Sequence, residues 1–303
     1  METPRAPHSR TTGTRSNEEP PPFNIDKFLA ASRQLDLSGI DLQDAAKYPL
    51  SPGEVRAIRF GQDTEFFTVL YMKALMETRA LADHEARAFL VTWGYEECSH
   101  GRALAKVLEI CGHAPSERSL ELFTKPRGWL EIVQDFAGRL ASAASHDFLA
   151  THMTWGAINE LTAIHSYSRL AALTANPILA EVARRIVKDE RRHFAFYFQQ
   201  ARRRLASPFA QRLAKLALKT LWAPVGASMA SQEDADFPLA YLFDGEEGRE
   251  CLRDVDRVIQ KLPGMEWFNL VEREACASIA RIHKAKIPVV RPSPVVTQPT
   301  VMA

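Results

Sequence analysis

Two segments of the sequence each place a glutamate and a histidine three residues apart. The first is Glu97-Cys-Ser-His100 and the second is Glu190-Arg-Arg-His193. A spacing of three puts both side chains on one face of an α-helix. Carboxylates and imidazoles together are ligands for transition metals such as iron. The two motifs therefore predict a metal site to which two helices contribute.

The helix face that carries each motif is otherwise apolar. It continues through Phe89, Trp93 and Leu104 around the first motif, and through Ile186 and Tyr197 around the second. Uncompensated charges are costly in such a core. One Glu-x-x-His motif is usually a pair on a helix surface, but two inward-facing copies indicate a metal centre.

Two further helices each offer one glutamate on an apolar face. The separation of Glu65 from Glu97 nearly equals that of Glu160 from Glu190, so in two antiparallel hairpins these acids fall at similar heights. Four carboxylates balance the charge of two divalent ions, and the mixture of oxygen and nitrogen ligands suits iron, or manganese, better than zinc. The six predicted ligands are Glu65, Glu97, His100, Glu160, Glu190 and His193.

Other polar and aromatic residues near the motifs have weaker patterns. Glu96 lies about 100° around the helix from Glu97, so we expect it to be exposed or to support a ligand. Tyr167 and Tyr197 face the site and are interpreted as packing residues. Five histidines without a partner pattern are interpreted as ordinary surface or core residues: His84, His113, His152, His165 and His283.

Four long helices are needed to position these residues. Strand signals are scarce, and stretches rich in Ala, Leu, Arg and Glu have helical periodicity. Ser51 and Pro52 form an N-terminal capping pair, and Gly112 is a plausible C-cap. We expect the four helices over residues 52–76, 83–111, 145–174 and 177–205, and shorter ones over 116–140, 209–222 and 248–262.

The ends of the sequence differ from its centre. Residues 1–22 are rich in Pro, Thr, Ser and Arg, and residues 287–303 contain recurring prolines, so both are predicted to be disordered tails. Residues 23–286 are predicted to form one all-α domain, a four-helix bundle with additional C-terminal helices. A chain of 303 residues with 46% hydrophobic residues can bury a sizeable core.

Charge and cysteine usage restrict the partners and the compartment. The net charge of +1 does not favour nucleic acid. A basic run from Arg184 to Lys219 is either a solvated helix face or a docking surface for an acidic partner. The four cysteines form no CxxC pair, so we expect them to be reduced in a cytoplasmic protein. We find neither a long apolar run for a membrane span nor a signal peptide.

Both motifs resemble those of a known family. Trp93-Gly-Tyr-Glu-Glu97-Cys-Ser-His100-Gly101 resembles the Trp-Thr-Ala-Glu-Glu-Asn-Arg-His-Gly of the soluble acyl-carrier-protein desaturases, and Asp189-Glu190-Arg-Arg-His193 resembles their Asp-Glu-Lys-Arg-His. The resemblance covers roughly residues 50–205. It implies the ferritin-like bundle of the di-iron carboxylate proteins.

The resemblance also implies roles for individual residues. Glu65 and Glu160 would be terminal ligands, while Glu97 and Glu190 would bridge two irons. Asp189 would orient a ligand histidine by a hydrogen bond, and Trp93 would lie just outside the ligands. The implied partners are a ferredoxin-type electron donor, an acyl carrier protein and a second copy of the chain in a homodimer.

The sequence departs from the family beside the ligands. Cys98 and Ser99 replace the polar Asn-Arg pair, and Ala163 stands where the family has a threonine, with Thr162 one position early. These changes leave the ligand set intact but affect the expected reaction. Small residues near Glu160, such as Gly156, Ala157 and Ala163, either leave room for a slim apolar substrate or allow close helix packing.

Three functions follow from these patterns. The first is an O2-activating di-iron oxidoreductase that acts on a fatty acyl chain, supplied with electrons from outside because the chain has no flavin or nicotinamide fingerprint. The second is a di-iron oxygenase that hydroxylates or N-oxygenates a small metabolite. The third is a non-catalytic ferritin-like protein that stores iron or is stabilised by a metal.

Overall fold

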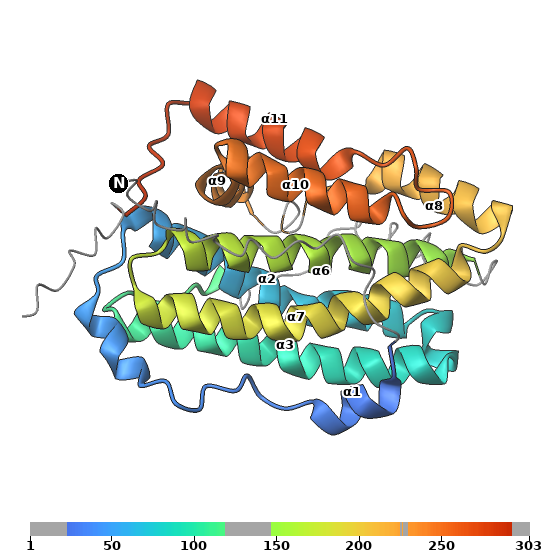
Figure 1. Cartoon of the computed structure of the whole chain (residues 1–303), viewed down its shortest axis with the longest axis horizontal. Coiled ribbons are helices and arrows are strands. Elements are labelled where there is room, and N and C mark those ends of the chain that lie inside the picture. The colour runs from blue at the N-terminus through green and yellow to red at the C-terminus, as the bar shows by residue number, and fades with distance from the viewer. Residues whose placement is uncertain (1–22, 119–146, 225, 227–229, 293–303) are drawn as a thin grey trace, which may run out of the picture.

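The computed structural model describes residues 23–118, 147–224, 226 and 230–292. Every regular element in these residues is a helix, which confirms the predicted all-α fold (Figure 1). The predicted tail at 1–22, most of the tail at 287–303 and most of the short helix predicted at 116–140 lie outside the described residues.

The first hairpin contains α2, Pro52–Met76, and α3, His84–Ile110. Helix α2 begins where the sequence predicts because Ser51 and Glu54 form a reciprocal capping box and Pro52 occupies the first helical position. Helix α3 begins after Asp83, whose side chain accepts a hydrogen bond from the Ala86 N–H. The short 3-10 helix Arg79–Ala82 connects α2 to α3.

The second hairpin contains α6, Phe148–Leu173, and α7, Pro177–Arg204. Asn176 separates the two helices. Its side chain accepts hydrogen bonds from the backbone N–H groups of Ile178 and Leu179, and Pro177 is the first residue of α7. Helices α2, α3, α6 and α7 run alongside one another as the four long helices of the bundle (Figure 1).

Aromatic and small residues fill the bundle core. The rings of Phe89 on α3 and Phe196 on α7 stack with centroids 3.6 Å apart. A Cβ added to Gly101 would come within 2.8 Å of the Phe66 ring, so glycine allows α3 to approach α2 closely. The two hairpins are thereby fixed at a definite separation, which positions the ligands they carry.

Helices α8 to α11 lie on the α6 side of the bundle (Figure 1). Helices α8, Pro208–Leu221, and α10, Glu246–Ile259, match two of the predicted shorter helices. The sequence interpretation missed α9, Gln232–Phe243, and α11, Leu270–Lys284. None of the helices in the described part of the chain combines the length and apolarity needed to cross a bilayer.

Two short elements precede the bundle. Helix α1, Ile25–Ala31, lies against α3, and a 3-10 helix, Leu42–Lys47, follows it. Phe28 of α1 is buried, and its ring lies 6.1 Å from that of His193. Helix α1 therefore closes the bundle on the side of α3 and α7, opposite the C-terminal helices (Figure 1).

Candidate metal centre

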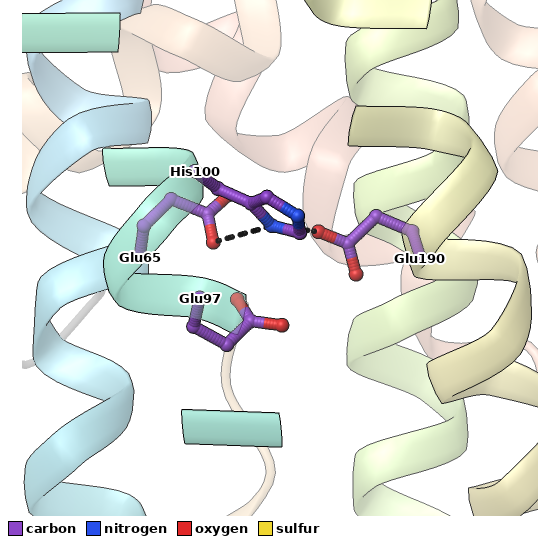
Figure 2. Close-up of side chains that lie close together, drawn as sticks. All are labelled: Glu65, Glu97, His100 and Glu190. Carbon is purple, nitrogen blue, oxygen red and sulfur yellow. Dashed lines mark ion pairs between the residues drawn. The ribbon is translucent and has the colours of Figure 1, made fainter. Parts of the chain in front are cut away.

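The six predicted ligands converge in the middle of the bundle as two overlapping groups of possible metal-binding side chains. The ligand atoms within each group all lie within 4.8 Å of one another, and every member is buried. The first group contains Glu65, Glu97, His100 and Glu190, which come from α2, α3 and α7 (Figure 2). The second group contains Glu97, Glu160, Glu190 and His193.

Glu97 and Glu190 belong to both groups. The two carboxylate oxygens of Glu190 face different histidines: Oε1 lies 3.2 Å from Nδ1 of His100, and Oε2 lies 3.1 Å from Nδ1 of His193. Oε1 of Glu97 lies 3.0 Å from Nδ1 of His193. This central placement is the one expected of carboxylates that bridge two ions. Glu65 and Glu160 each join one group only, as expected of terminal ligands.

Several atoms at the centre of the cluster face only other ligand atoms. Oε1 of Glu97, Nδ1 of His100 and Oε1 of Glu190 are buried and lie 3.0–3.2 Å from an opposing imidazole or carboxylate atom, but none of them forms a well-aligned hydrogen bond in the described residues. Buried polar atoms in folded proteins are normally hydrogen-bonded. Buried carboxylate and imidazole atoms that face one another without well-aligned hydrogen bonds are suited to bind cations. Six ligands of this kind are enough for two divalent ions.

The carboxylates of the cluster repel one another. Burial, followed by repulsion from Glu190 and Glu65, raises the pKa of Glu97 well above its usual value. Burial and Glu190 likewise raise the pKa of Glu160. Burial also opposes ionisation of Glu190, but the adjacent imidazoles of His100 and then His193 outweigh it and lower the pKa of this carboxyl. Bound cations would remove the remaining repulsion.

A second layer of charged residues holds the two histidines. Nε2 of His100 lies 3.5 Å from Oδ2 of Asp189, and Nε2 of His193 lies 2.7 Å from Oε2 of Glu96. A carboxylate on Nε2 leaves Nδ1 of each ring free for a metal. Burial alone would lower the pKa of both histidines, but the surrounding carboxylates outweigh it and raise the pKa of each.

Arg192 joins the two outer carboxylates. Its guanidinium donates to Glu96 at 2.9 Å and to Asp189 at 2.8 Å. Glu96 is fully buried, so the expectation that it could be exposed is wrong and its supporting role is the one observed. Each outer acid immediately precedes a central glutamate in the sequence. The family resemblance already predicts a supporting role for Asp189, and the same doublet is the signal that could have singled out Glu96.

Tyrosines at the cluster differ in their contacts. The hydroxyl of Tyr167 donates a hydrogen bond to Oε1 of Glu65, so interpreting Tyr167 as a packing residue was incomplete. The hydroxyl of Tyr197 is buried without a partner, and its ring packs edge-on against Phe89 and Trp93. Tyr197 is therefore a packing residue, and Trp93 packs against it. The predicted place of Trp93 just outside the ligands stays a prediction.

The histidines interpreted as ordinary residues are not part of the metal cluster. Nε2 of His165 lies 3.2 Å from Oδ2 of Asp254. Burial would lower the pKa of His165, but the adjacent carboxylate of Asp254 and then the thiol of Cys251 outweigh it and raise the pKa to about 9. His152 contacts the Tyr71 hydroxyl, and burial lowers its pKa to about 4.

A cavity of about 420 Å³ adjoins the cluster between α2 and α6. Four ligands line it: Glu65, Glu97, Glu160 and Glu190. Its remaining wall is mainly apolar and extends to the C-terminal end of α8, where Leu221 and the following residue Trp222 contribute. A small organic molecule in this cavity would lie directly beside the metal positions.

The small residues near Glu160 have two different roles. A Cβ on Gly156 would come within 2.3 Å of the Tyr197 ring, so this glycine serves close packing between α6 and α7. Ala157 is buried and does not line the cavity, whereas both Gly156 and Ala163 do. Of the three small residues, only Ala163 therefore makes room beside the cluster without another side chain filling the space.

No protein-family model, curated protein or solved structure matches the chain. The resemblance to the acyl-carrier-protein desaturases therefore stays a prediction from the two motifs. The buried Glu/His cluster is compatible with a pair of metal ions on the evidence of its own geometry.

Proposed function

We propose that this chain is an O2-activating, non-haem di-iron oxidoreductase. The observation that carries the proposal is the pair of Glu/His groups that share Glu97 and Glu190 and open onto a cavity. Glu65 with His100 would hold one iron, and Glu160 with His193 would hold the other. A reduced iron pair bound there would supply electrons to activate O2 for the oxidation of an unactivated C–H bond.

The protein's own residues would orient the ligands and the substrate. Arg192 fixes Glu96 and Asp189, and these acids fix the rings of His193 and His100. Such supporting contacts commonly change metal affinity by about 10–100-fold. The apolar wall of the cavity would exclude water from the oxidised position, because polar solvent gains little from contact with it.

The substrate that we propose first is a fatty acyl chain, delivered by an acyl carrier protein as in the soluble desaturases. Two observations support it: the resemblance of both ligand motifs and the apolar cavity that reaches the ligands. A ferredoxin-type protein would supply the electrons. The expected product has lost two hydrogens relative to the substrate.

A second candidate is an oxygenase that adds oxygen to a small metabolite with a polar group. Polar side chains line the cavity at Thr64, Asn159 and Thr162. Oδ1 of Asn159 is buried without a partner, while the hydroxyls of Thr64 and Thr162 donate to carbonyl oxygens of their own helices. These oxygens remain available as acceptors, which favours a substrate with an N–H or O–H group.

Product analysis separates these functions. The protein would be loaded with Fe(II), given reductant and O2, and incubated with a panel of acyl-acyl-carrier-proteins and amines. Mass spectrometry then distinguishes a loss of two hydrogens from a gain of oxygen. The matched control is the double variant Glu97→Ala/His193→Ala, which should be inactive because both groups lose ligands.

The outcomes decide between the candidates. A desaturated acyl chain supports the first substrate, and an oxygenated amine or alcohol supports the second. Iron binding without turnover of any substrate, in protein that consumes no O2, would contradict the oxidoreductase proposal and leave a metal-binding protein.

A further inference from the structure

The basic run from Arg184 to Lys219 consists of two parts with different partners. On α7, most of its arginines contact acids: Arg185 pairs with Glu181, and Arg204 pairs with Asp83. These cations are already neutralised within the protein. They serve to hold the bundle together and leave less charge for an external partner.

The cations of α8 are not paired with carboxylates in this way. Nε of Arg212 donates to the backbone carbonyl of Pro208, and the ammonium groups of Lys215 and Lys219 lie 5.6 and 4.9 Å from the centre of the Trp267 ring. Among the described residues, none of these three cations forms an ion pair. The sequence contains no Asp or Glu between Glu190 and Glu233, so α8 itself carries only positive charges.

Large apolar side chains are exposed along the same helix. Phe209 is 56% exposed, Leu216 is 63% exposed and Leu221 is 70% exposed. Phe209 and Leu216 lie seven residues apart, which places them on one face, and Arg212 and Lys219 flank them. The opposite face packs on α6 through the buried residues Ala210, Ala214 and Leu218.

We propose that α8 docks on the surface of an anionic lipid bilayer. Cations that flank exposed Phe and Leu residues are the pattern of helices that lie in the plane of a membrane interface. The apolar side chains would enter the boundary between headgroups and acyl chains, while the cations would contact anionic headgroups. Trp267, which contacts both lysines, adds an aromatic side chain of the kind enriched at this depth.

Two other occupants fit the surface less well. A symmetric contact with a second copy of the chain would place cations opposite cations, with no acid on the helix to compensate them. An acidic carrier protein would satisfy Arg212, Lys215 and Lys219, but its water-soluble acidic face would leave Phe209 and Leu216 without apolar partners. An anionic bilayer offers acyl chains to the exposed apolar side chains and anionic headgroups to the cations.

The position of α8 connects the docking surface to the cavity. Leu221 is exposed at the end of the helix and also lines the cavity, and Trp222 lines the cavity directly after it. A bilayer against α8 would therefore lie near one end of the apolar cavity. Membrane docking itself depends neither on the proposed function nor on the carrier that delivers the substrate.

A vesicle flotation assay tests the docking surface without any turnover. The full chain would be mixed with vesicles of phosphatidylcholine alone or with about 30% phosphatidylglycerol, a fraction that gives a negative surface potential of the physiological kind. We expect binding to the anionic vesicles, weakened by high salt. Iron-loaded and metal-free proteins should bind alike, so loss of the metal site would not affect the result.

Matched variants locate the contact. Leu216→Ser should weaken vesicle binding about tenfold because one apolar side chain no longer enters the interface. Lys215→Gln should weaken it about fivefold, as expected for one cation near an anionic surface. Val91→Ser, at a 56% exposed apolar residue on α3, and Lys188→Gln, at an exposed cation on α7, should leave binding unchanged.

Several results would overturn the proposal. One is the absence of binding to anionic vesicles by a protein whose circular dichroism is that of a folded helical chain. Another is binding that Leu216→Ser and Val91→Ser weaken equally. A third is an unmodified chain that binds no vesicles but self-associates or binds acyl carrier protein, with that binding lost in Leu216→Ser. The surface would then belong to that partner instead.

Discussion

The two halves of the metal cluster have the same ligand types but different surroundings. His193 is held by Glu96 at 2.7 Å, and this carboxylate is fully buried. His100 is held by Asp189 at 3.5 Å, and the Asp189 side chain is 16% exposed. Tyr167 donates a hydrogen bond to Glu65, whereas in the described part of the chain no hydroxyl donates to Glu160.

This difference indicates that the two metal positions are not equivalent. A short, buried, charged hydrogen bond holds an imidazole more firmly than a longer one that is partly open to water. The position at Glu160 and His193 should therefore be the more rigid, and the position at Glu65 and His100 the more adjustable. Variants that affect one half, both halves or neither can test this.

Removal of a ligand should have the largest effect. Glu190→Ala should reduce the bound iron from two ions to none, because both groups lose a central carboxylate. Glu160→Ala should leave one ion, bound at Glu65 and His100. Iron content after gel filtration measures the difference, and equal losses in the two variants would contradict the assignment of Glu190 as the shared ligand.

Removal of Arg192 should affect both halves together. Arg192→Gln leaves Glu96 and Asp189 without their cation, so we expect the free energy of unfolding to fall by about 3 kcal/mol in urea. The neighbouring Arg191 is exposed and supplies the control, since Arg191→Gln should change stability by less than about 0.5 kcal/mol. Similar values for the two variants would show that Arg192 does not support the outer acids.

Changes to the outer carboxylates should separate the halves. Glu96→Gln and Asp189→Asn should each weaken Fe(II) binding by about 10–100-fold, with the larger loss for Glu96 because its contact is shorter and fully buried. Anaerobic titration of Fe(II) measures both affinities. A larger loss for Asp189→Asn would reverse the order of rigidity proposed for the two positions.

The smallest effect should come from the tyrosine hydroxyls. Tyr167→Phe removes a hydrogen bond to a carboxylate and should destabilise the protein by about 1.5 kcal/mol. Tyr197→Phe removes a buried hydroxyl that has no partner and should be neutral or slightly stabilising. Thermal unfolding of the two variants compares them directly, and an equal destabilisation would argue against the Tyr167–Glu65 bond.

Local patterns were sufficient to predict the main helices and the convergence of the six proposed ligands. The start of α2 depends on Ser51 and Glu54, which are close in sequence, and the Glu-x-x-His motifs depend on helix geometry alone. Helix α9 was missed because Pro238 lies inside it and proline normally interrupts a helix. Burial of Phe237 and Tyr241 overrides this local preference.

Contacts between distant segments could not be read from the sequence. The bond from Tyr167 to Glu65 depends on how α6 is rotated against α2, and the bridge through Arg192 depends on the register of α3 and α7. Neither rotation nor register follows from the periodicity of one helix. The same limit applies to the basic run. Only the folded structure shows that arginines of α7 pair with acids while the cations of α8 do not.

The stoichiometry and spacing of bound iron test the central claim most directly. Anaerobic titration of the purified chain with Fe(II), followed by X-ray absorption spectroscopy, should give two irons per chain with a metal–metal separation of about 3.5–4 Å. The double variant Glu97→Ala/His193→Ala should bind neither ion. One iron per chain, or two irons still bound in the double variant, would contradict the di-iron cluster.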